Sequence, residues 1–315
     1  MNELTIVQGN AIARRATLDE LSSRWISFVD AAPRTVDTYT KNIRRFLAYL
    51  KENGITLTRE TAKREIVVAY RDYLKATYKP TTVQGYMAAV KLFFRWAAQE
   101  DLLPNIADRV KGAKLDAGHK KDYLTSRQVN RLLKGIDRDS LVGLRDYAIL
   151  SVMVTTGLRE VSIARANIGD IRTAGDAVAL FYQGKGHEEK ADYVKLAEPV
   201  EEAVRAYLKA RGETNADAPL FGALANRNAG GRMTTRSISR IAKSRLIAAG
   251  LESNRLTGHS LRHTAATLNL LNGGTIEETR QLLGHRNINT TLIYSHALDR
   301  AKNNSEKRIA KAVFG

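Results

Sequence analysis

The chain has 315 residues, a formal net charge of +17 and no cysteine. Its length and its 43% of hydrophobic residues suffice for two domains with separate cores. The absence of cysteine excludes disulfides, thiolate metal sites and cysteine nucleophiles, so covalent catalysis would need Ser, Thr, Tyr, Lys, His or a carboxylate. The basic charge favours a polyanionic partner, with nucleic acid first. Because the sequence contains neither a membrane-spanning run nor a secretion signal, we expect a soluble, cytoplasmic and nucleoid-associated protein.

Residues 1 to about 111 are predicted to form an all-α domain of four helices. Thr17 and Glu20 form a capping-box pattern before the first helix. Thr35 is the predicted cap of the second helix, which is expected to end at Gly54. The third helix covers about 62–76 and Pro80 opens the fourth. Apolar residues recur at helical spacing in this region, so each helix has one face for a common core.

The stretch 112–122, GAKLDAGHKKD, has almost no large apolar residue and is predicted to be an exposed linker. A second domain, 123–315, follows. Thr125 and Gln128 repeat the capping-box pattern, and a buried central helix is expected at about 141–156. Two strands around a glycine-containing turn are predicted within 177–196. Further helices are expected at about 198–211, 235–249, 261–272, 276–283 and 288–296. The fold is therefore predicted to be mainly α with a small β-sheet.

Four polar clusters punctuate the second domain. They are Thr-Gly-Leu-Arg at 156–159, Gly-Lys-Gly at 184–186, His-Ser-Leu-Arg-His at 259–263, and Leu-Gly-His at 283–285, with Tyr294 nine residues further on. In this order and at these intervals the clusters resemble the catalytic signature of the tyrosine recombinases, which include phage integrases and the bacterial Xer recombinases. The resemblance runs through the whole second domain and implies a mixed α/β catalytic domain. The first domain looks like the SAM-like core-binding domain of that family.

The resemblance implies an enzyme that cuts and rejoins duplex DNA through a 3′-phosphotyrosine intermediate and a Holliday junction, with Tyr294 as the nucleophile. Attack at phosphorus puts extra negative charge on the non-bridging oxygens. Arg159 and Arg262 are the candidates to bind these oxygens, because a guanidinium stays charged and presents a planar fork of donors. Energy stored in the phosphotyrosine bond would serve religation, so neither a cofactor nor a metal ion is expected.

Proton transfer needs further side chains. By resemblance, His259 is the candidate general base and His285 a supporting donor. Lys185, at the tip of the predicted hairpin, would donate a proton to the departing 5′ oxygen, with Lys190 as a possible substitute. His263 lies four residues after His259, so the pair could bind a metal, but without a third ligand of the usual thiolate type internal packing is the favoured role.

One position departs from the family's pattern. Relatives commonly carry an acidic residue three positions after the first catalytic arginine, where it helps to hold that side chain, whereas this chain has Ser162. Glu160, adjacent to Arg159, is a possible substitute. The departure puts in question which residue holds the Arg159 side chain. Arg159 itself still matches the family's pattern.

The two domains are expected to close around duplex DNA bearing inverted-repeat core sites. Basic helix residues are candidates for phosphate contacts: Arg44, Arg45, Lys91, Arg95, Arg240, Lys243 and Arg245. In relatives a C-terminal helix docks on the neighbouring subunit of a tetramer, and the amphipathic tail SEKRIAKAVFG is expected to do the same, with folding back on its own domain as the alternative. Because the first domain is predicted to start near Thr17, we expect the simpler two-domain type without the arm-binding domain of lambda-type integrases.

Two other functions share some of these features. A type IB topoisomerase uses the same tyrosine chemistry, although it relaxes supercoils as a monomer. A DNA-binding regulator without catalysis would occupy sites only. The favoured interpretation is a recombinase that integrates or excises a mobile element or resolves DNA, with accessory directionality proteins as possible partners.

Overall fold

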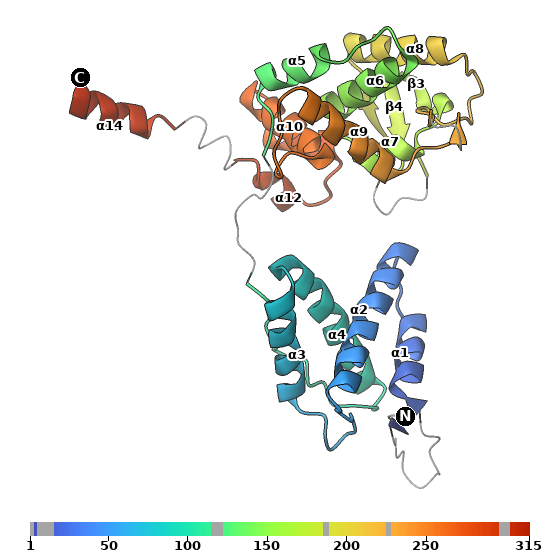
Figure 1. Cartoon of the computed structure of the whole chain (residues 1–315), viewed down its shortest axis with the longest axis vertical. Coiled ribbons are helices and arrows are strands. Elements are labelled where there is room, and N and C mark those ends of the chain that lie inside the picture. The colour runs from blue at the N-terminus through green and yellow to red at the C-terminus, as the bar shows by residue number, and fades with distance from the viewer. Residues whose placement is uncertain (1–2, 5–15, 115–121, 185–188, 225–227, 296–302) are drawn as a thin grey trace. The chain divides into compact units, whose positions relative to one another are not determined.

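The computed structural model of the chain describes residues 3–4, 16–114, 122–184, 189–224, 228–295 and 303–315. The chain divides into two compact units, Met1–Ala117 and Gly118–Gly315 (Figure 1). Each unit has its own hydrophobic core. None of the helices in the described part combines the length and the apolar character that crossing a membrane requires.

The first unit is built from four helices, as predicted. They are α1 (Leu18–Ser27), α2 (Pro33–Glu52), α3 (Arg64–Thr77) and α4 (Pro80–Gln99). The capping box of Thr17 and Glu20 is present at the start of α1. The predicted cap Thr35 is wrong, because Pro33, whose ring fixes a helical φ, already occupies the first turn and Ala32 precedes it as the N-cap. A two-residue pairing of β1 (Glu3–Leu4) with β2 (Ala16–Thr17) was not predicted.

Aromatic side chains fill the core of the first unit. Phe46, Phe93 and Phe94 are fully buried, and Phe46 packs edge-on against Phe94 with ring centroids 5.9 Å apart. The unit extends slightly past the boundary expected near residue 111. Ala113 is buried in this core, and its carbonyl accepts a hydrogen bond of 2.7 Å from the side chain of Gln84. Part of the stretch predicted as linker is therefore attached to the first unit.

The second unit combines helices with one three-stranded sheet, which agrees with the predicted fold class. The elements up to the sheet's last strand are α5 (Ser126–Lys134), α6 (Leu141–Thr156), α7 (Glu160–Arg165), the 3-10 turn η1 (Ile168–Asp170), β3 (Ile171–Ala174), β4 (Ala177–Tyr182) and β5 (Asp192–Lys195). Those that follow are α8 (Glu198–Arg211), α9 (Thr235–Ala248), α10 (Gly258–Leu271), α11 (Ile276–Leu283), α12 (Asn289–Leu292) and α14 (Ser305–Phe314).

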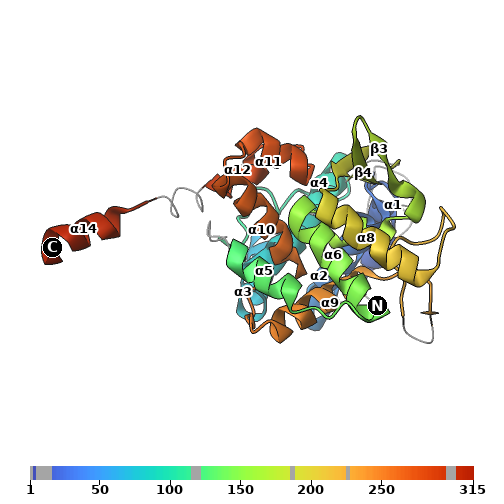
Figure 2. The same cartoon turned by 90° about the horizontal axis from the view of Figure 1, so that it is seen from above.

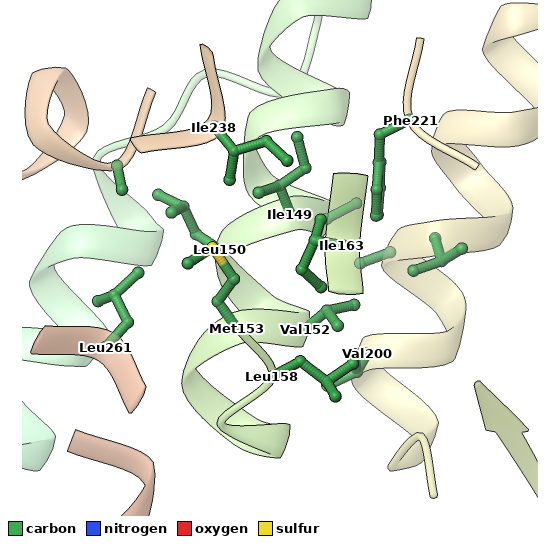
Figure 3. Close-up of a cluster of buried hydrophobic side chains, with 14 of the residues drawn as sticks. Ile149, Leu150, Val152, Met153, Leu158, Ile163, Val200, Phe221, Ile238 and Leu261 are labelled. Atoms are coloured by element: carbon green, nitrogen blue, oxygen red, sulfur yellow. The ribbon is translucent and has the colours of Figure 1, made fainter. Parts of the chain in front are cut away.

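Helix α6 lies at the centre of the second unit, as its almost entirely apolar sequence predicted. Figure 3 shows its side chains surrounded by residues from four other helices: Ile163 of α7, Val200 of α8, Ile238 of α9 and Leu261 of α10. Figures 1 and 2 both show α8 alongside it. Because neighbours hold α6 on all sides, its C-terminal end has a fixed position, and the first polar cluster begins there.

The sheet is antiparallel in the order β3-β4-β5, and Tyr182 at the end of β4 pairs with Asp192 of β5. The sequence predicted β4 and β5 and missed β3, which is only four residues long and lacks a continuous apolar pattern. Alternation along β4 turns Leu180 and Tyr182 into the core, while Phe181 lies on the other face against Tyr193. The strand therefore places one aromatic side chain, Tyr182, in the interior at its C-terminal end.

The boundaries of two helices next to candidate site residues, α10 and α12, differ from their predicted positions. Helix α10 begins at Gly258, three residues before the predicted start, and a capping box of Thr257 and Ser260 fixes this end. Its first turn therefore contains His259. The predicted helix at 288–296 is much shorter, since α12 covers only Asn289–Leu292.

Candidate active site

The most enclosed charged group among the motif residues is the guanidinium of Arg262, which is 3% exposed. It donates hydrogen bonds to the carbonyl oxygens of Gly157, at 2.5 Å, and Leu283, at 2.6 Å. These oxygens belong to the C-terminal ends of α6 and α11, where backbone carbonyls lack helical partners and the helix dipole is negative. Two helix ends far apart in sequence thus hold one arginine in a fixed orientation.

Two glycines allow these helix ends to approach Arg262. Gly157 and Gly284 both cap their helices in the left-handed conformation, with φ of 64° and 60°. A Cβ atom on Gly157 would lie 2.6 Å from a methyl carbon of Leu283, and one on Gly284 would lie 2.8 Å from the hydroxyl oxygen of Tyr182. Glycine is therefore needed at both positions for backbone conformation and for space.

Arg159 is the second cation of the site and is less enclosed than Arg262. It is the N-cap residue of α7, two residues after the end of α6. Burial, reinforced by the nearby charge of Arg159, lowers the pKa of Arg262 to about 10. The Arg262 guanidinium therefore remains charged at neutral pH, although the nearby charge of Arg159 repels it. Such a pair of cations favours an anion between or beside them.

His285 is buried, and its Nδ1 lies 2.9 Å from the hydroxyl oxygen of Thr291 on α12. Burial, together with the charges of Arg262 and Arg159, lowers the pKa of His285 to about 4. Its own carbonyl oxygen accepts a hydrogen bond of 2.7 Å from Arg280. The imidazole is therefore neutral near pH 7 and is held in place from two sides.

The depressed pKa of His285 makes the stability of the second unit depend on pH. Between about pH 6.5 and 4 the unfolded chain takes up a proton at this position and the folded chain does not, so the free energy of unfolding falls as the pH falls. Replacing His285 by Asn should remove roughly 1–2 kcal/mol of this decrease. Denaturant titrations of both proteins across this range measure the difference. His259→Asn, at an exposed imidazole, is the control, and a wild-type curve parallel to that of His285→Asn would contradict the assignment.

Tyr294 lies in the same neighbourhood as the two arginines, within one chain. Its side chain is 2% exposed and packs with Leu270 and Leu283. Burial raises the pKa of Tyr294, while the charges of Arg262 and Arg159 lower it. The phenol is therefore protonated at neutral pH and stands in the field of both guanidiniums.

The two histidines of the third cluster, His259 and His263, pack edge to face on one side of α10. Their rings are nearly perpendicular, with centroids 4.7 Å apart, and the ring of His263 also lies 5.4 Å from that of Tyr294. His259 is exposed and His263 is buried. Within the described ranges, no three His, Asp or Glu side chains are grouped so that they could hold a metal ion. His263 packs internally, as expected, and in doing so contacts both His259 and Tyr294.

The candidate general acid, Lys185, lies outside the described residues. Its possible substitute, Lys190, lies two residues before β5. The ammonium of Lys190 forms an ion pair of 2.5 Å with Asp170 and donates to the carbonyl oxygen of Arg165 at 3.1 Å. These contacts fix the end of the Lys190 side chain beside η1.

Ser162 stands where relatives commonly carry an acidic residue, and Glu160 was the possible substitute for holding Arg159. Ser162 is buried in α7, and Glu160 points to other elements, since its carboxylate accepts a hydrogen bond from Ser239 of α9 and lies against Gly258 at the start of α10. Burial raises the pKa of Glu160. Among the described contacts, none joins Glu160 to Arg159. Glu160 therefore joins α7 to α9 and to the N-terminal end of α10, the helix that carries His259 and His263.

The seven candidates for phosphate contacts fall into two groups. In the first group the side chain is open to solvent to some degree and no internal ion pair is found among the described residues: Arg44, Lys91, Arg95 and Arg240. In the second group, Arg45 bonds to the hydroxyl of Tyr73 and Lys243 donates to the carbonyl oxygens of Ser253, at 2.7 Å, and Leu256, at 3.3 Å. Arg45 and Lys243 therefore have defined internal roles.

Arg245 also belongs to the second group. Two of its nitrogens donate to one carboxylate oxygen of Asp146, at 2.7 and 2.9 Å, while Arg145 donates to the other oxygen. Asp146 and Arg145 are buried on α6. The shared carboxylate therefore ties α9 to the central helix, and Arg245 has an internal role in this contact.

Several residues of the site were not found from the sequence. Tyr182 places its hydroxyl beside Gly284, Thr291 contacts the imidazole of His285, and Arg280 holds the backbone of His285. The glycine that ends each predicted helix was a usable signal for the two helix ends. No periodicity marks Tyr182, because an inward aromatic residue on a strand is usually part of the core.

Comparison with known proteins gives a consistent result. Residues 122–301, more than half of the chain, match the model of the phage integrase family, and residues 28–101 match that of the phage integrase N-terminal SAM-like domain. The chain is 31% identical to the tyrosine recombinase XerC of Pelobacter propionicus over 290 residues, covering 89% of this chain and 91% of the relative. It is 28% identical to XerD of Oceanobacillus iheyensis over 273 residues, covering 83% and 87%.

Solved structures share the fold. The XerH site-specific recombinase bound to palindromic difH substrate superposes with a TM-score of 0.72 at 20% identity, covering 90% of this chain and 83% of that one. A lambda integrase dimer bound to a COC′ core site gives a TM-score of 0.68 at 16% identity, covering 89% and 95%. The chain belongs to the phage integrase family and is a tyrosine recombinase, an enzyme of site-specific DNA recombination.

Proposed function

We propose that this recombinase cleaves each DNA strand by attack of the Tyr294 hydroxyl on a phosphodiester. The phenolic oxygen forms a bond to phosphorus, the bond from phosphorus to the 5′ oxygen breaks, and a 3′-phosphotyrosine and a free 5′ hydroxyl result. Attack by the 5′ hydroxyl of a partner strand reverses these steps and joins the strands through a Holliday junction. The number of phosphoester bonds is conserved, so no external energy source is needed.

In this proposal Arg262 and Arg159 bind the non-bridging oxygens of the phosphate. Supporting this role, the fork of Arg262 is oriented before DNA arrives by the carbonyls of Gly157 and Leu283, so little reorganisation is needed as charge develops. Arg159 adds a second positive charge from the start of α7. Neutral His285 would donate one further hydrogen bond, since an imidazole with a pKa of about 4 keeps a single N–H near pH 7.

Protons must leave the nucleophile and reach the leaving group. His259, at the exposed first turn of α10, would accept the proton of Tyr294, while His263 keeps the three rings together. Lys185 would protonate the departing 5′ oxygen, which is a poor leaving group as an alkoxide. The single observation that supports the proposal most is that one chain brings the Tyr294 phenol into the field of Arg159 and Arg262 together.

Covalent trapping tests this proposal. A pool of randomised duplexes is first selected for binding to the chain, and the recovered site is nicked at successive positions of its centre. Cleavage beside a nick releases a short fragment bearing the 5′ hydroxyl, so the adduct accumulates. We expect a covalent adduct that maps to Tyr294. The absence of any adduct on a bound site would instead support a regulator without catalysis.

Strand exchange separates recombination from relaxation. Two duplexes of different length, each bearing the selected site, are incubated with the enzyme. Joined products that contain one arm from each duplex are expected from a recombinase. Relaxation of a supercoiled plasmid without such products would favour topoisomerase activity.

We further propose that the enzyme acts as a tetramer on inverted-repeat core sites, through exchange of its C-terminal helix. The XerH complex holds palindromic difH substrate and the lambda integrase complex holds core-site DNA, which supports a DNA partner of this kind. In α14 the apolar residues Ile309, Val313 and Phe314 are 63%, 66% and 88% exposed, so the helix does not bury them in its own unit. An amphipathic helix with its apolar side uncovered is suited to docking on a second copy.

Removing α14 should therefore weaken assembly. A chain ending at Asn304 is expected to bind a half-site normally and to lose about tenfold or more in the affinity with which it forms the tetrameric complex on paired sites. Gel mobility and light scattering on site DNA measure both properties. Ile309→Ser with Val313→Ser gives a matched test within the full-length chain. Normal assembly and recombination by both variants would rule out the docking role.

A further inference from the structure

A second tyrosine, Tyr182, lies at the site beside the proposed nucleophile. It is the last residue of β4, and its side chain is 6% exposed. Its hydroxyl oxygen would be 2.8 Å from a Cβ atom on Gly284. That glycine lies between Leu283, whose carbonyl holds Arg262, and His285. The Tyr182 hydroxyl therefore reaches the same backbone segment that orients two of the proposed phosphate ligands.

The hydroxyl of Tyr182 still has its hydrogen-bonding capacity available. Among the hydrogen bonds of the described residues, none involves this oxygen, although a buried tyrosine hydroxyl normally has a partner. Tyr207, a fully buried tyrosine of the same unit, accepts a hydrogen bond of 3.0 Å from the backbone nitrogen of Gly222. The Tyr182 oxygen has no such bond among the described residues and is not one of the fully enclosed unpaired atoms there, so it is open to an external partner.

The electrostatic surroundings of Tyr182 define what that partner is. Burial, and then the carboxylate of Asp192 on the neighbouring strand, raise the pKa of Tyr182, whereas the charges of Arg262 and Arg159 lower it. The net direction is upward, so the group is a neutral O–H donor at neutral pH. A donor within the field of two guanidiniums is suited to an anion that both guanidiniums also bind.

Resting on the function proposed above, we propose that Tyr182 donates a hydrogen bond to a non-bridging oxygen of the scissile phosphate and is thus a further catalytic residue. The geometry that supports this is the convergence of its hydroxyl, the Gly284 backbone and the Arg262 fork at the end of α11. The ring is fixed by the sheet and by the core around Leu180, so the donor is preorganised for charge that grows in the transition state. The proposal leaves Tyr294 as the nucleophile.

Single-turnover cleavage of the nicked site tests the proposal. Tyr182→Phe keeps the ring and removes only the donor, so we expect unchanged DNA affinity, unchanged thermal stability and a cleavage rate about 10- to 100-fold lower. Tyr193→Phe, on the adjacent strand and half exposed, is the matched control and should cleave at the wild-type rate. A wild-type rate for Tyr182→Phe would overturn the proposal.

Stereochemically pure methylphosphonates at the scissile position test contact with the phosphate itself. Each diastereomer replaces one non-bridging oxygen by a methyl group, so the Tyr182→Phe penalty should vanish on one diastereomer and persist on the other. An equal penalty on both would assign Tyr182 to positioning Gly284 and overturn the phosphate contact. A Tyr182 adduct formed by Tyr294→Phe would also overturn it. If the wild-type enzyme forms no adduct at all, the proposed function fails, whereas normal adduct formation by Tyr182→Phe removes only this inference.

Discussion

Tyr294→Phe is expected to bind the selected DNA site with wild-type affinity and to form no covalent adduct, with cleavage reduced by at least about 10⁴-fold. The substitution removes a single oxygen. Its ring still fills the space beside Leu270 and Leu283, so folding should be unaffected. Phenylalanine has no hydroxyl to attack phosphorus, so the step that forms the covalent bond is lost. Electrophoresis of labelled DNA under denaturing conditions measures the adduct.

Two comparisons make the Tyr294 result specific. Tyr207→Phe, at a buried tyrosine that bonds to the backbone of Gly222, tests whether losing any buried hydroxyl in this unit disturbs cleavage. Mixing Tyr294→Phe with the Arg262 variant described below tests whether nucleophile and phosphate ligands come from one subunit, since they share a neighbourhood in one chain. Adduct formation by Tyr294→Phe alone would show that the nucleophile is another residue.

The helices were the most predictable part of the fold. The spacing of apolar residues gave α6 at its observed bounds, and the capping boxes at Thr17 and Thr125 marked true helix starts. These signals are local, since a cap or an amphipathic face is encoded within a few turns. The predicted cap at Thr35 was wrong because Pro33 competes for the same helix start, and β3 was missed because a four-residue strand is defined mainly by its partner β4.

The site was predictable as a set of residues but not as an arrangement. The order of the four clusters pointed to Arg159, Arg262, His285 and Tyr294, and the structure places His285 and Tyr294 each within the field of both arginines. What the sequence could not provide were the contacts across long separations. The carbonyl of Gly157 reaches Arg262 across 105 positions, and Tyr182 approaches Gly284 from a strand that is distant in sequence. Such contacts depend on tertiary packing around α6, for which one sequence carries no direct signal.

Arg262→Lys should lower the rate of single-turnover cleavage by about 10²- to 10³-fold while preserving the charge. A guanidinium can donate to the carbonyls of Gly157 and Leu283 and still present nitrogens to an anion, because its donors form a planar fork. An ammonium offers three donors from a single point, at the end of a side chain of different length. A lysine therefore cannot donate to both the helix-end carbonyls and the phosphate oxygens.

The buried carbonyls give this prediction a second observable. If lysine leaves one of them without a donor, the second unit should also lose about 1–3 kcal/mol of unfolding free energy. Arg205→Lys, at an exposed ion pair with Glu201 on α8, is the matched control and should change neither property. Loss of stability with normal cleavage would show that Arg262 only packs against the ends of α6 and α11. Loss of cleavage with unchanged stability would show that Arg262 acts only through its contact with the phosphate. A variant unchanged in both properties would remove Arg262 from the site.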